Sequence, residues 1–492
     1  MQIRRPLKSD SDQNASFSAK RIRMTMIGCT VVCIGFAGLF GYRYGIRPVI
    51  DSSINAYVNS ITYQTIQDYA MEGDYLDRNG NQIMTCQTPG TSATAQYPQN
   101  YSFAYLLGYY SVSGMQENMY GLRGNLKDYT LFHMDENNTG ASIHLTVDIG
   151  LQNYCWQLLN QIDGSIIVLD NETGAILALA SNSLVDYDVN DVNTLLGSDV
   201  EGSQYRRGTY ETDPPGSTFK IVTAVAALTK QKEEGLDDSW FDYTDYGSYY
   251  AEGSDFRITN WADLVYGQIN LEKAMNSSVN TYFADLGVRT GKEQLEKTAE
   301  KFLIGKDIEI PFLTTIHSSM DIGNRQIELA QASFGQGKTQ ITPLHIAMIT
   351  QSVANNGHMM QPYIVSSIVD GKIPLYKAFP HRLSTTMDTD VNEKLKQILH
   401  STAVGYGFDE YTYGNVYAKT GTAECVNDRI HTYITGFTDE YTFVVSYNNS
   451  SISTVNVPAA QALVQYLNNV NDPNSKESEL VTHSYGPGVI TR

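Results

Sequence analysis

The spacing of apolar residues becomes regular from residue 143 onward and predicts a strand there. Residues 165–169 and 175–179 are two further short apolar runs, and both are predicted to be strands. The four residues 171–174 between them end in Gly174. We therefore expect the two runs to form a β-hairpin with this glycine at its turn.

The middle of the chain is predicted to be helical, and its end returns to strands. Helical spacing or helix boundary signals are present in residues 149–162, 217–230, 271–288, 292–302, 327–334, 343–355, 391–403 and 459–470. Strands are expected at residues 416–419, 433–437 and 441–447, which are close enough in sequence to pair in antiparallel fashion. Strands at both ends with helices between them predict one α/β domain, an antiparallel sheet flanked by helices that the C-terminal strands complete.

The chain before residue 147 follows a different pattern. Residues 24–42 are nineteen residues without a charge, which at about 1.5 Å per residue is enough to span the hydrocarbon core of a membrane. Residues 1–23 carry six Lys or Arg against two Asp, so this tail is predicted to be cytoplasmic. A cleaved signal peptide is the alternative, but the run is long and no A-x-A site follows.

These patterns divide the chain into four parts. We expect residues 1–23 to be a cytoplasmic tail and residues 24–42 a single transmembrane anchor. Residues 43–146 are expected to form a separate, mixed, non-catalytic domain; between residues 103 and 131 they show no clean helical period. Residues 147–492 are expected to be the catalytic domain, on the extracytoplasmic side of the membrane.

Composition narrows the class of function. The formal net charge of −19 argues against a nucleic-acid partner. The cysteines show no C-x-x-C or Cys/His ligand spacing, so neither a metal nor another cofactor is expected. One Cys86–Cys155 disulfide remains open, although unpaired thiols are favoured. The five cysteines are Cys29, Cys33, Cys86, Cys155 and Cys425.

The first candidate for chemistry is Ser217, in Ser217-Thr218-Phe219-Lys220. A serine hydroxyl needs a base within reach to become a nucleophile, and a lysine three residues later shares its face of a helix. Lys220 can act as that base only when it is neutral, which burial and a second cation favour. The alternative is a helix N-terminus with Ser217 as its cap and Lys220 solvated. Pro-Pro-Gly immediately before Ser217 favours an exposed turn into a helix.

The second candidate is Ser278-Val279-Asn280. The Ser278 hydroxyl could pass a proton from Lys220 to a leaving amine, and Asn280 could hold the backbone of a substrate. The S-x-N spacing is weak evidence alone, because residues 53–55 and 446–448 share it. Its position between the two other motifs favours it over a plain helix cap.

The third candidate is Lys419-Thr420-Gly421-Thr422, at the end of a predicted strand. Lys419 supplies a cation for a carboxylate, Thr420 a hydroxyl donor, and Gly421 allows close approach of backbone. The backbone N–H groups of Ser217 and Thr422 could form an oxyanion hole. The alternative is an ordinary strand end that turns at Gly421. The similar residues 289–291 follow a helix and are predicted to be its C-cap.

The ordered set S-x-x-K, S-x-N and K-T-G resembles that of the class B penicillin-binding proteins, the monofunctional peptidoglycan D,D-transpeptidases. Asp77-Arg78-Asn79-Gly80 also fits this family, whereas Glu72 stands where the family usually has Arg. Further family-like stretches are Leu145-Thr146-Val147-Asp148, Thr173-Gly174-Ala175-Ile176-Leu177-Ala178, Gly335-Gln336-Gly337, Thr342-Pro343-Leu344 and Thr435-Gly436-Phe437.

The resemblance implies a transpeptidase domain on a pedestal domain, with a Ser217 acyl-enzyme formed from stem peptides as D-Ala is released. It also implies acylation of Ser217 by β-lactams and a multispanning glycan polymerase as partner. Two alternatives remain open: a D,D-carboxypeptidase or β-lactamase on the same fold, and a non-catalytic penicillin sensor or scaffold.

Overall fold

The computed structural model describes scattered residues between Met24 and Gly38, and then residues 71–471 with gaps. The gaps are residues 87–94, 109, 114–115, 120, 131–138, 160–161, 184–194, 196–197, 200–203, 205, 409–413, 425–429 and 451–454. The chain separates into two compact units, Met1–Tyr69 and Ala70–Arg492.

In the first unit the described residues are helical, and the Thr30 hydroxyl donates to the Met26 carbonyl at 2.8 Å. Among the residues that the structure describes, no helix is both long and apolar enough to cross a membrane. Most of the predicted anchor, residues 24–42, lies outside the described residues.

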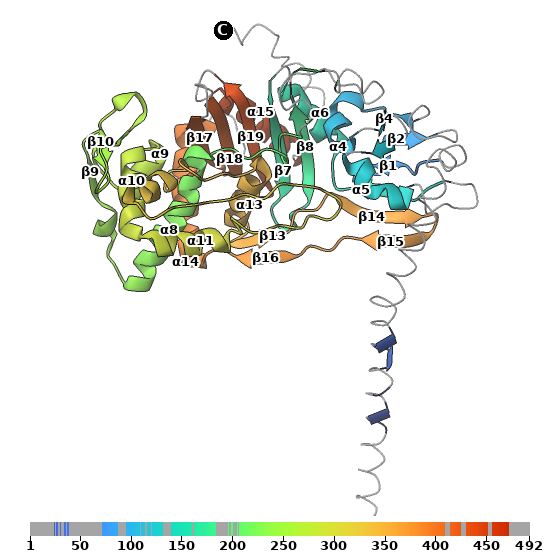
Figure 1. Ribbon diagram of the computed structural model, residues 1–492, viewed down its shortest axis with the longest axis horizontal. Coiled ribbons are helices and arrows are strands. Elements are labelled where there is room, and N and C mark those ends of the chain that lie inside the picture. Colours follow the sequence, from blue (N-terminus) through green and yellow to red (C-terminus); the bar gives the residue numbers. More distant parts are fainter. Residues whose placement is uncertain are drawn as a thin grey trace, which may run out of the picture. The chain divides into compact units, whose positions relative to one another are not determined.

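One sheet of the second unit has five strands in the described part of the chain, and every neighbouring pair is antiparallel (Figure 1). Its order is β17 (Tyr417–Glu424), β18 (Ile430–Phe437), β19 (Tyr441–Ser450), β7 (Gly164–Asp170) and β8 (Ile176–Asn182). The predicted hairpin is β7–β8, and Gly174 at its turn has φ +77°. The predicted antiparallel sheet, completed by the C-terminal strands, is therefore confirmed.

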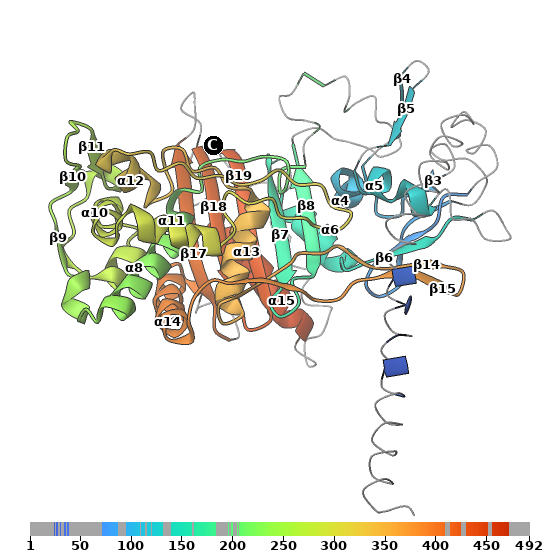
Figure 2. The ribbon, with the colours of Figure 1, turned by 60° about the horizontal axis from the view of Figure 1, so that its bottom comes forward.

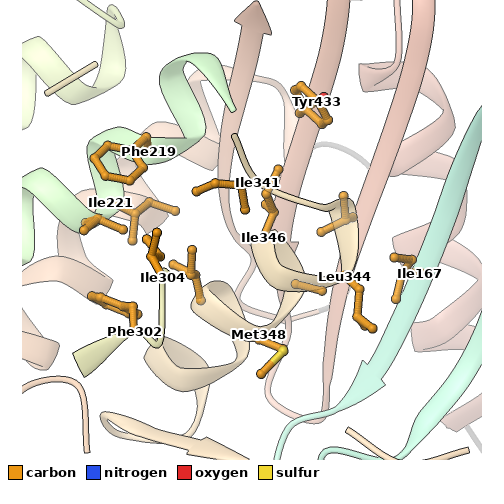
Figure 3. Close-up of a cluster of buried hydrophobic side chains, with 14 of the residues drawn as sticks. Ile167, Phe219, Ile221, Phe302, Ile304, Ile341, Leu344, Ile346, Met348 and Tyr433 are labelled. Carbon is orange, nitrogen blue, oxygen red and sulfur yellow. The ribbon is translucent and has the colours of Figure 1, made fainter. Parts of the chain in front are cut away.

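Both faces of this sheet are covered by helices, and β7 shows how the sequence produces this. Ile166 and Val168 pack in a core with helices α6 (Ile149–Leu158) and α15 (Val457–Asn471). Ile167 and Leu169 belong to the opposite core, which includes α8 (Lys220–Glu234) and α13 (Pro343–Ala354). Figure 3 shows Ile167 beside Leu344 of α13, and Figure 2 shows α13 against the sheet. Because successive side chains alternate between faces, a strand that is covered on both sides has apolar residues at consecutive positions, as residues 166–169 do.

Helices occupy the chain between the strands, with one departure from the sequence prediction. The expected helix 271–288 is two helices, because Ser278 adopts a left-handed conformation, φ +53°, that a continuous helix cannot contain. A 3₁₀ turn, η2 (Gly216–Phe219), precedes α8. Gly291 caps α10 with φ +90°, as predicted for residues 289–291. The further helices are α9 (Leu271–Asn276), α10 (Asn280–Thr290), α11 (Lys292–Lys301), α12 (Gln326–Ala332) and α14 (Thr389–Gly405).

Three antiparallel two-stranded sheets complete this region of the described chain. They are β9 (Tyr243–Asp245) with β12 (Gly267–Ile269), β10 (Ser248–Tyr250) with β11 (Arg257–Thr259), and β13 (His358–Met360) with β16 (Arg382–Thr385).

The second sheet has six strands in the described residues, and it joins distant parts of the sequence (Figure 2). Its order is β15 (Ile373–Lys377), β14 (Val365–Asp370), β6 (Ser142–Leu145), β1 (Tyr75–Leu76), β2 (Gln82–Cys86) and β3 (Ala95–Gln96). Two strands from beyond residue 360 therefore extend this sheet: β14 pairs with β6 of the expected N-terminal domain, and β15 pairs with β14. The same region holds two helices where no helical period was found, α4 (Asn100–Leu107) and α5 (Gly121–Thr130), and the hairpin β4 (Tyr110–Ser113) with β5 (Gln116–Met119).

Glu72 takes part in a buried ion pair. Its carboxylate accepts from Arg123 Nε at 3.1 Å and from Arg123 Nη2 at 2.5 Å. The Arg123 side chain is 1% exposed and that of Glu72 is not exposed at all. Arg123 Nη1 donates to the Tyr97 hydroxyl at 2.6 Å. The acidic residue thus has its own cationic partner, on α5.

The D-R-N-G turn links the N-terminal strands to the start of α6. The Asp77 carboxylate accepts the backbone N–H groups of Asn79 and Asn81, both at 2.8 Å, which fixes the turn. Asn79 Nδ2 donates to Asp148 Oδ2 at 3.0 Å, and Asp148 is the N-cap residue of α6. This turn therefore ties β1 and β2 directly to the first helix that covers the five-stranded sheet.

Cys86 and Cys155 are both buried and free. Burial raises the pKa of the Cys86 thiol to about 12 and raises that of Cys155 as well. Both are thus neutral small apolar residues at physiological pH. Cys29, Cys33 and Cys425 lie outside the described residues.

Candidate active site

The turn that carries Ser217 is built by close backbone contacts. Ser217 lies in η2 and is half-buried. Gly216 has φ +53°, and its N–H donates to the Gly335 carbonyl at 3.0 Å. Gly335 has φ +78°, and a Cβ on it would lie 2.0 Å from the Gly216 oxygen. Only glycine at both positions allows this approach, which explains the first glycine of the Gly335-Gln336-Gly337 stretch seen in the sequence.

Lys220 is the first residue of α8, and its side chain is completely buried. Its Nζ donates to Ser278 O at 2.8 Å, to Ser278 Oγ at 3.2 Å and to Asn280 Oδ1 at 2.8 Å. The Phe283 ring centroid lies 5.3 Å from the same nitrogen. Burial lowers the pKa of Lys220 well below its usual value, and the charge of Lys419 lowers it further. The site therefore favours the neutral amine that a general base requires.

A hydrogen bond between Ser217 and Lys220 is not among those that the described residues make. Lys220 is engaged by Ser278 and Asn280 instead. Catalytic hydrogen bonds often close only when substrate is bound, so this geometry keeps Lys220 a candidate base.

Ser278 lies between two lysines. Its left-handed conformation costs roughly 1–3 kcal/mol, and it turns both the carbonyl and the hydroxyl of Ser278 toward Lys220. The Ser278 hydroxyl oxygen also accepts from Lys419 Nζ at 3.1 Å. Lys419 donates to Oγ, so when Lys220 is neutral and its two N–H groups are taken by Ser278 O and Asn280 Oδ1, the Ser278 hydroxyl can donate to the Lys220 lone pair.

Asn280 holds Lys220 in place. Its Oδ1 accepts from Lys220, and its Nδ2 donates to the Thr259 carbonyl at 3.1 Å. The role expected from sequence was to hold the backbone of a substrate. In the structure both polar atoms of this side chain have partners within the protein.

Lys419 is also completely buried, on β17. Besides Ser278 Oγ, its Nζ donates to the Tyr406 hydroxyl at 3.3 Å and to the Thr420 carbonyl at 3.1 Å. Two lysine side chains thus meet at one serine hydroxyl, although they lie far apart in the sequence.

The backbone of Thr422 faces the nucleophile turn. A Cβ on Gly216 would lie 2.3 Å from Thr422 O and 3.0 Å from Thr422 N. In an antiparallel pair the N–H and C=O of one residue point to the same side, so both Thr422 groups lie on the edge of β17 away from β18. A Cβ on Gly421 would lie 2.8 Å from the Pro215 oxygen. The predicted oxyanion donors of Ser217 and Thr422 therefore belong to two segments in close backbone contact.

The sequence prediction missed Tyr406. It is half-buried just after α14, and its hydroxyl contacts both Lys419 and Thr420, the latter at 2.8 Å. No motif spacing relates a tyrosine thirteen residues upstream to a K-T-G strand, so the sequence offered no signal for it. Among the described residues there is also no cluster of His, Cys, Asp or Glu that could hold a metal ion.

The sequence from residue 164 to 465 matches the penicillin binding protein transpeptidase domain. The chain therefore belongs to this family, as a class B penicillin-binding protein. The resemblance based on the three motifs is confirmed.

Individual relatives agree with this assignment. The peptidoglycan D,D-transpeptidase PbpA of Mycobacterium tuberculosis H37Rv is 26% identical over 372 residues, which cover 68% of this chain and 73% of PbpA. The peptidoglycan D,D-transpeptidase MrdA of Haemophilus influenzae is 28% identical over 257 residues, 48% of this chain but 38% of MrdA, so the match spans less than half of that relative.

Solved structures show the same fold. Penicillin-binding protein A from M. tuberculosis, as an imipenem acyl-enzyme complex, has a TM-score of 0.72 and 23% identity, covering 82% of this chain and 99% of that one. PBP2 of Pseudomonas aeruginosa, in complex with WCK 5153, has a TM-score of 0.70 and 22% identity, covering 84% and 99%.

Proposed function

We propose that this chain is a peptidoglycan D,D-transpeptidase that cross-links stem peptides through an ester on Ser217, and that β-lactams acylate the same serine. The observation that carries the proposal is the Ser278 hydroxyl held between the buried amines of Lys220 and Lys419. Family membership and relatives named D,D-transpeptidases support the reaction class.

In the acylation step, Ser217 Oγ attacks the carbonyl carbon of the penultimate D-Ala while neutral Lys220 takes the hydroxyl proton. The negative charge that develops on the carbonyl oxygen is stabilised by the N–H groups of Ser217 and Thr422. The tetrahedral intermediate collapses by breaking the peptide bond. The proton on Lys220 passes through the Ser278 hydroxyl to the leaving amine, and D-Ala departs.

The second step reverses these roles. An amine from a neighbouring stem peptide attacks the Ser217 ester, and its proton returns through Ser278 and Lys220 to Ser217 Oγ. A new peptide bond forms as the ester bond breaks. The charge of Lys419 lowers the pKa of Lys220 and offers a cation near the carboxylate of the donor peptide.

The proposal includes a location and a partner. The uncharged residues 24–42 after a basic tail support a single membrane anchor, with the catalytic domain on the extracytoplasmic side. Family resemblance supports a multispanning glycan polymerase as partner, contacted by the anchor and the N-terminal domain.

The first test is stoichiometric labelling of the full-length protein, purified in detergent, with a fluorescent penicillin. We expect one stable label per chain in the wild type and none in Ser217→Ala. Ser446→Ala is the matched control, because it removes the serine of a second S-x-N sequence, in β19, and should leave labelling intact.

The other outcomes discriminate between activities. Rapid release of the label would indicate a β-lactamase and contradict the proposal. A stable label together with release of D-Ala from a pentapeptide, but no transfer to an added amine, would indicate a D,D-carboxypeptidase. A folded wild type that neither takes the label nor releases D-Ala would indicate a non-catalytic scaffold.

A further inference from the structure

The Tyr406 hydroxyl lies between the two polar side chains of the K-T-G strand. Its oxygen is 3.3 Å from Lys419 Nζ and 2.8 Å from Thr420 Oγ1, and the Thr420 backbone nitrogen is 3.5 Å away. The Tyr406 backbone is held on both sides: its N–H donates to Ala403 O at 3.0 Å, and its carbonyl accepts from Gln461 Nε2 at 2.9 Å. Helices α14 and α15 thus fix where this hydroxyl lies.

The direction of the hydrogen bonds follows from which groups can only donate. An ammonium group and a backbone N–H have no acceptor, so both Lys419 Nζ and the Thr420 N–H donate to the Tyr406 oxygen. The hydrogen of Tyr406 then needs an acceptor of its own, and Thr420 Oγ1 at 2.8 Å is in place. In this contact either hydroxyl could be the donor, and the two donors already on the Tyr406 oxygen favour Tyr406 donating to Thr420.

This direction has a consequence for Thr420. When its oxygen accepts from Tyr406, its own hydrogen must point away from the tyrosine and is available to a ligand. Lys419, Tyr406 and Thr420 then form a chain of donors in which each bond polarises the next. A chain that starts at an ammonium group and ends in a free hydroxyl hydrogen is suited to an anion, and a carboxylate is acceptor-only when ionised.

We propose that Tyr406 is a positioning residue that fixes the Thr420 hydroxyl as a donor to the terminal carboxylate of the acyl donor. Tyr406 thereby contributes to the preference for carboxylate-ended substrates over neutral ones. The inference rests on the proposed function, in which the acyl donor ends in D-Ala and so carries this carboxylate.

The test compares two probes on the full-length protein: a fluorescent penicillin and the methyl ester of its ring carboxylate. The ratio of their second-order acylation rate constants measures carboxylate preference. In Tyr406→Phe we expect this ratio to fall about tenfold, because the Thr420 hydroxyl is no longer fixed as a donor to the carboxylate and the acid therefore loses more rate than the ester. A merely structural role would lower both rates together and leave the ratio unchanged, which would overturn the inference.

Two further variants sharpen the test. Tyr417→Phe removes a phenolic hydroxyl from β17, on a ring that stacks on Phe437 at 4.4 Å, and should keep the wild-type ratio. Thr420→Val should lose the preference as Tyr406→Phe does, and adding Tyr406→Phe to it should lower the ratio no further. A Thr420→Val protein with the wild-type ratio, or fully additive effects, would overturn the inference even if Tyr406→Phe folded poorly.

Failure of the proposed function has a different signature. In that case the wild type would react with neither probe, and the inference would fall with it. A wild type that prefers the acid over the ester, beside a Tyr406→Phe variant with the same preference, would overturn the inference alone.

Discussion

Single atoms decide the geometry of this site. Gly216 and Gly335 have positive φ, and a Cβ on either would overlap the backbone of a neighbouring segment. Ser278 adopts a strained left-handed backbone conformation, and in it the carbonyl and hydroxyl oxygens of Ser278 both face Lys220. Two buried lysines then meet at its hydroxyl, so that one of them is favoured to be neutral.

The contact between Gly216 and Thr422 gives a prediction for acylation. In Gly216→Ala the new Cβ would lie 2.3 Å from Thr422 O, so η2 and β17 must separate and the two proposed oxyanion donors with them. We expect acylation by a fluorescent penicillin to fall at least about 100-fold. Gly235→Ala is the control, because it has a similar φ of +65° with open space around it and should lose stability but no acylation rate. Wild-type acylation of a folded Gly216→Ala protein would contradict the proposed hole.

The charge of Lys419 gives a prediction for pH dependence. A base must be neutral, so acylation rises with pH through the pKa of Lys220, and the positive charge of Lys419 lowers that pKa. Lys419→Met removes the charge, so the pKa of Lys220 rises and the acid limb of the profile moves to higher pH. The pH–rate profile is measured with the penicillin methyl ester. The ester has no carboxylate for Lys419 to bind, so the profile reports only the pKa of Lys220. Lys396→Met, which removes a half-buried lysine on α14, should leave the limb in place; an unmoved limb in Lys419→Met would count against this role.

At the scale of elements, a buried ion pair joins α5 to the residues before β1. Breaking the pair in Glu72→Gln leaves the Arg123 charge buried and unpaired, so we expect about 3–5 kcal/mol of lost stability. Replacing both residues with Met should restore most of it, because the charges are then removed together. Urea unfolding measures both effects.

The control for this buried ion pair is an ion pair on the protein surface. Asp390→Asn breaks the contact with Lys232 on the surface and is expected to leave the urea midpoint unchanged. A Glu72→Gln protein as stable as Asp390→Asn would show that Arg123 finds another partner or reaches water.

Helices and strands could be predicted from the sequence wherever burial of their faces produces a regular spacing of apolar residues. The β7–β8 hairpin, α13 and the C-terminal strands follow directly from their apolar spacing. The sequence predicts one continuous helix over residues 271–288, because the spacing of apolar residues does not reveal that Ser278 alone is left-handed. The helices α4 and α5 are short and were missed among Tyr and Gly residues. The motif residues were identifiable by spacing, whereas Tyr406 reaches Lys419 only through the tertiary fold.

At the scale of the whole molecule, the expected boundary at residue 146 passes through one compact unit. Strand β6 pairs with β14 on one side and β1 on the other, and Ile143, Leu145, Val365 and Ile368 are buried in one core. Catalytic and N-terminal parts thus share a sheet and its apolar face.

This shared sheet predicts how truncations behave. Residues 70–492 should fold and be acylated at the wild-type rate, because that unit is compact by itself. Residues 147–492 should aggregate, because β14 would lose β6 and expose a strand edge and its apolar residues. Circular dichroism, solution light scattering and penicillin labelling distinguish the two. A monomeric, labelled 147–492 protein would show that the catalytic part does not depend on this sheet.

The same sheet determines when its strands can pair during translation. The Thr146 hydroxyl donates to the carbonyl of Ile364, 218 residues later in the chain, and β6 cannot find its antiparallel partner before that residue has been made. The strands β1, β2, β3 and β6 can pair with one another, but an emerging chain must leave the other edge of β6 unpaired until β14 has been made, which slows folding and prolongs exposure to aggregation. A ribosome that stalls before residue 365 would release a fragment with an open strand edge, and such a fragment is a natural substrate for chaperones and quality-control proteases.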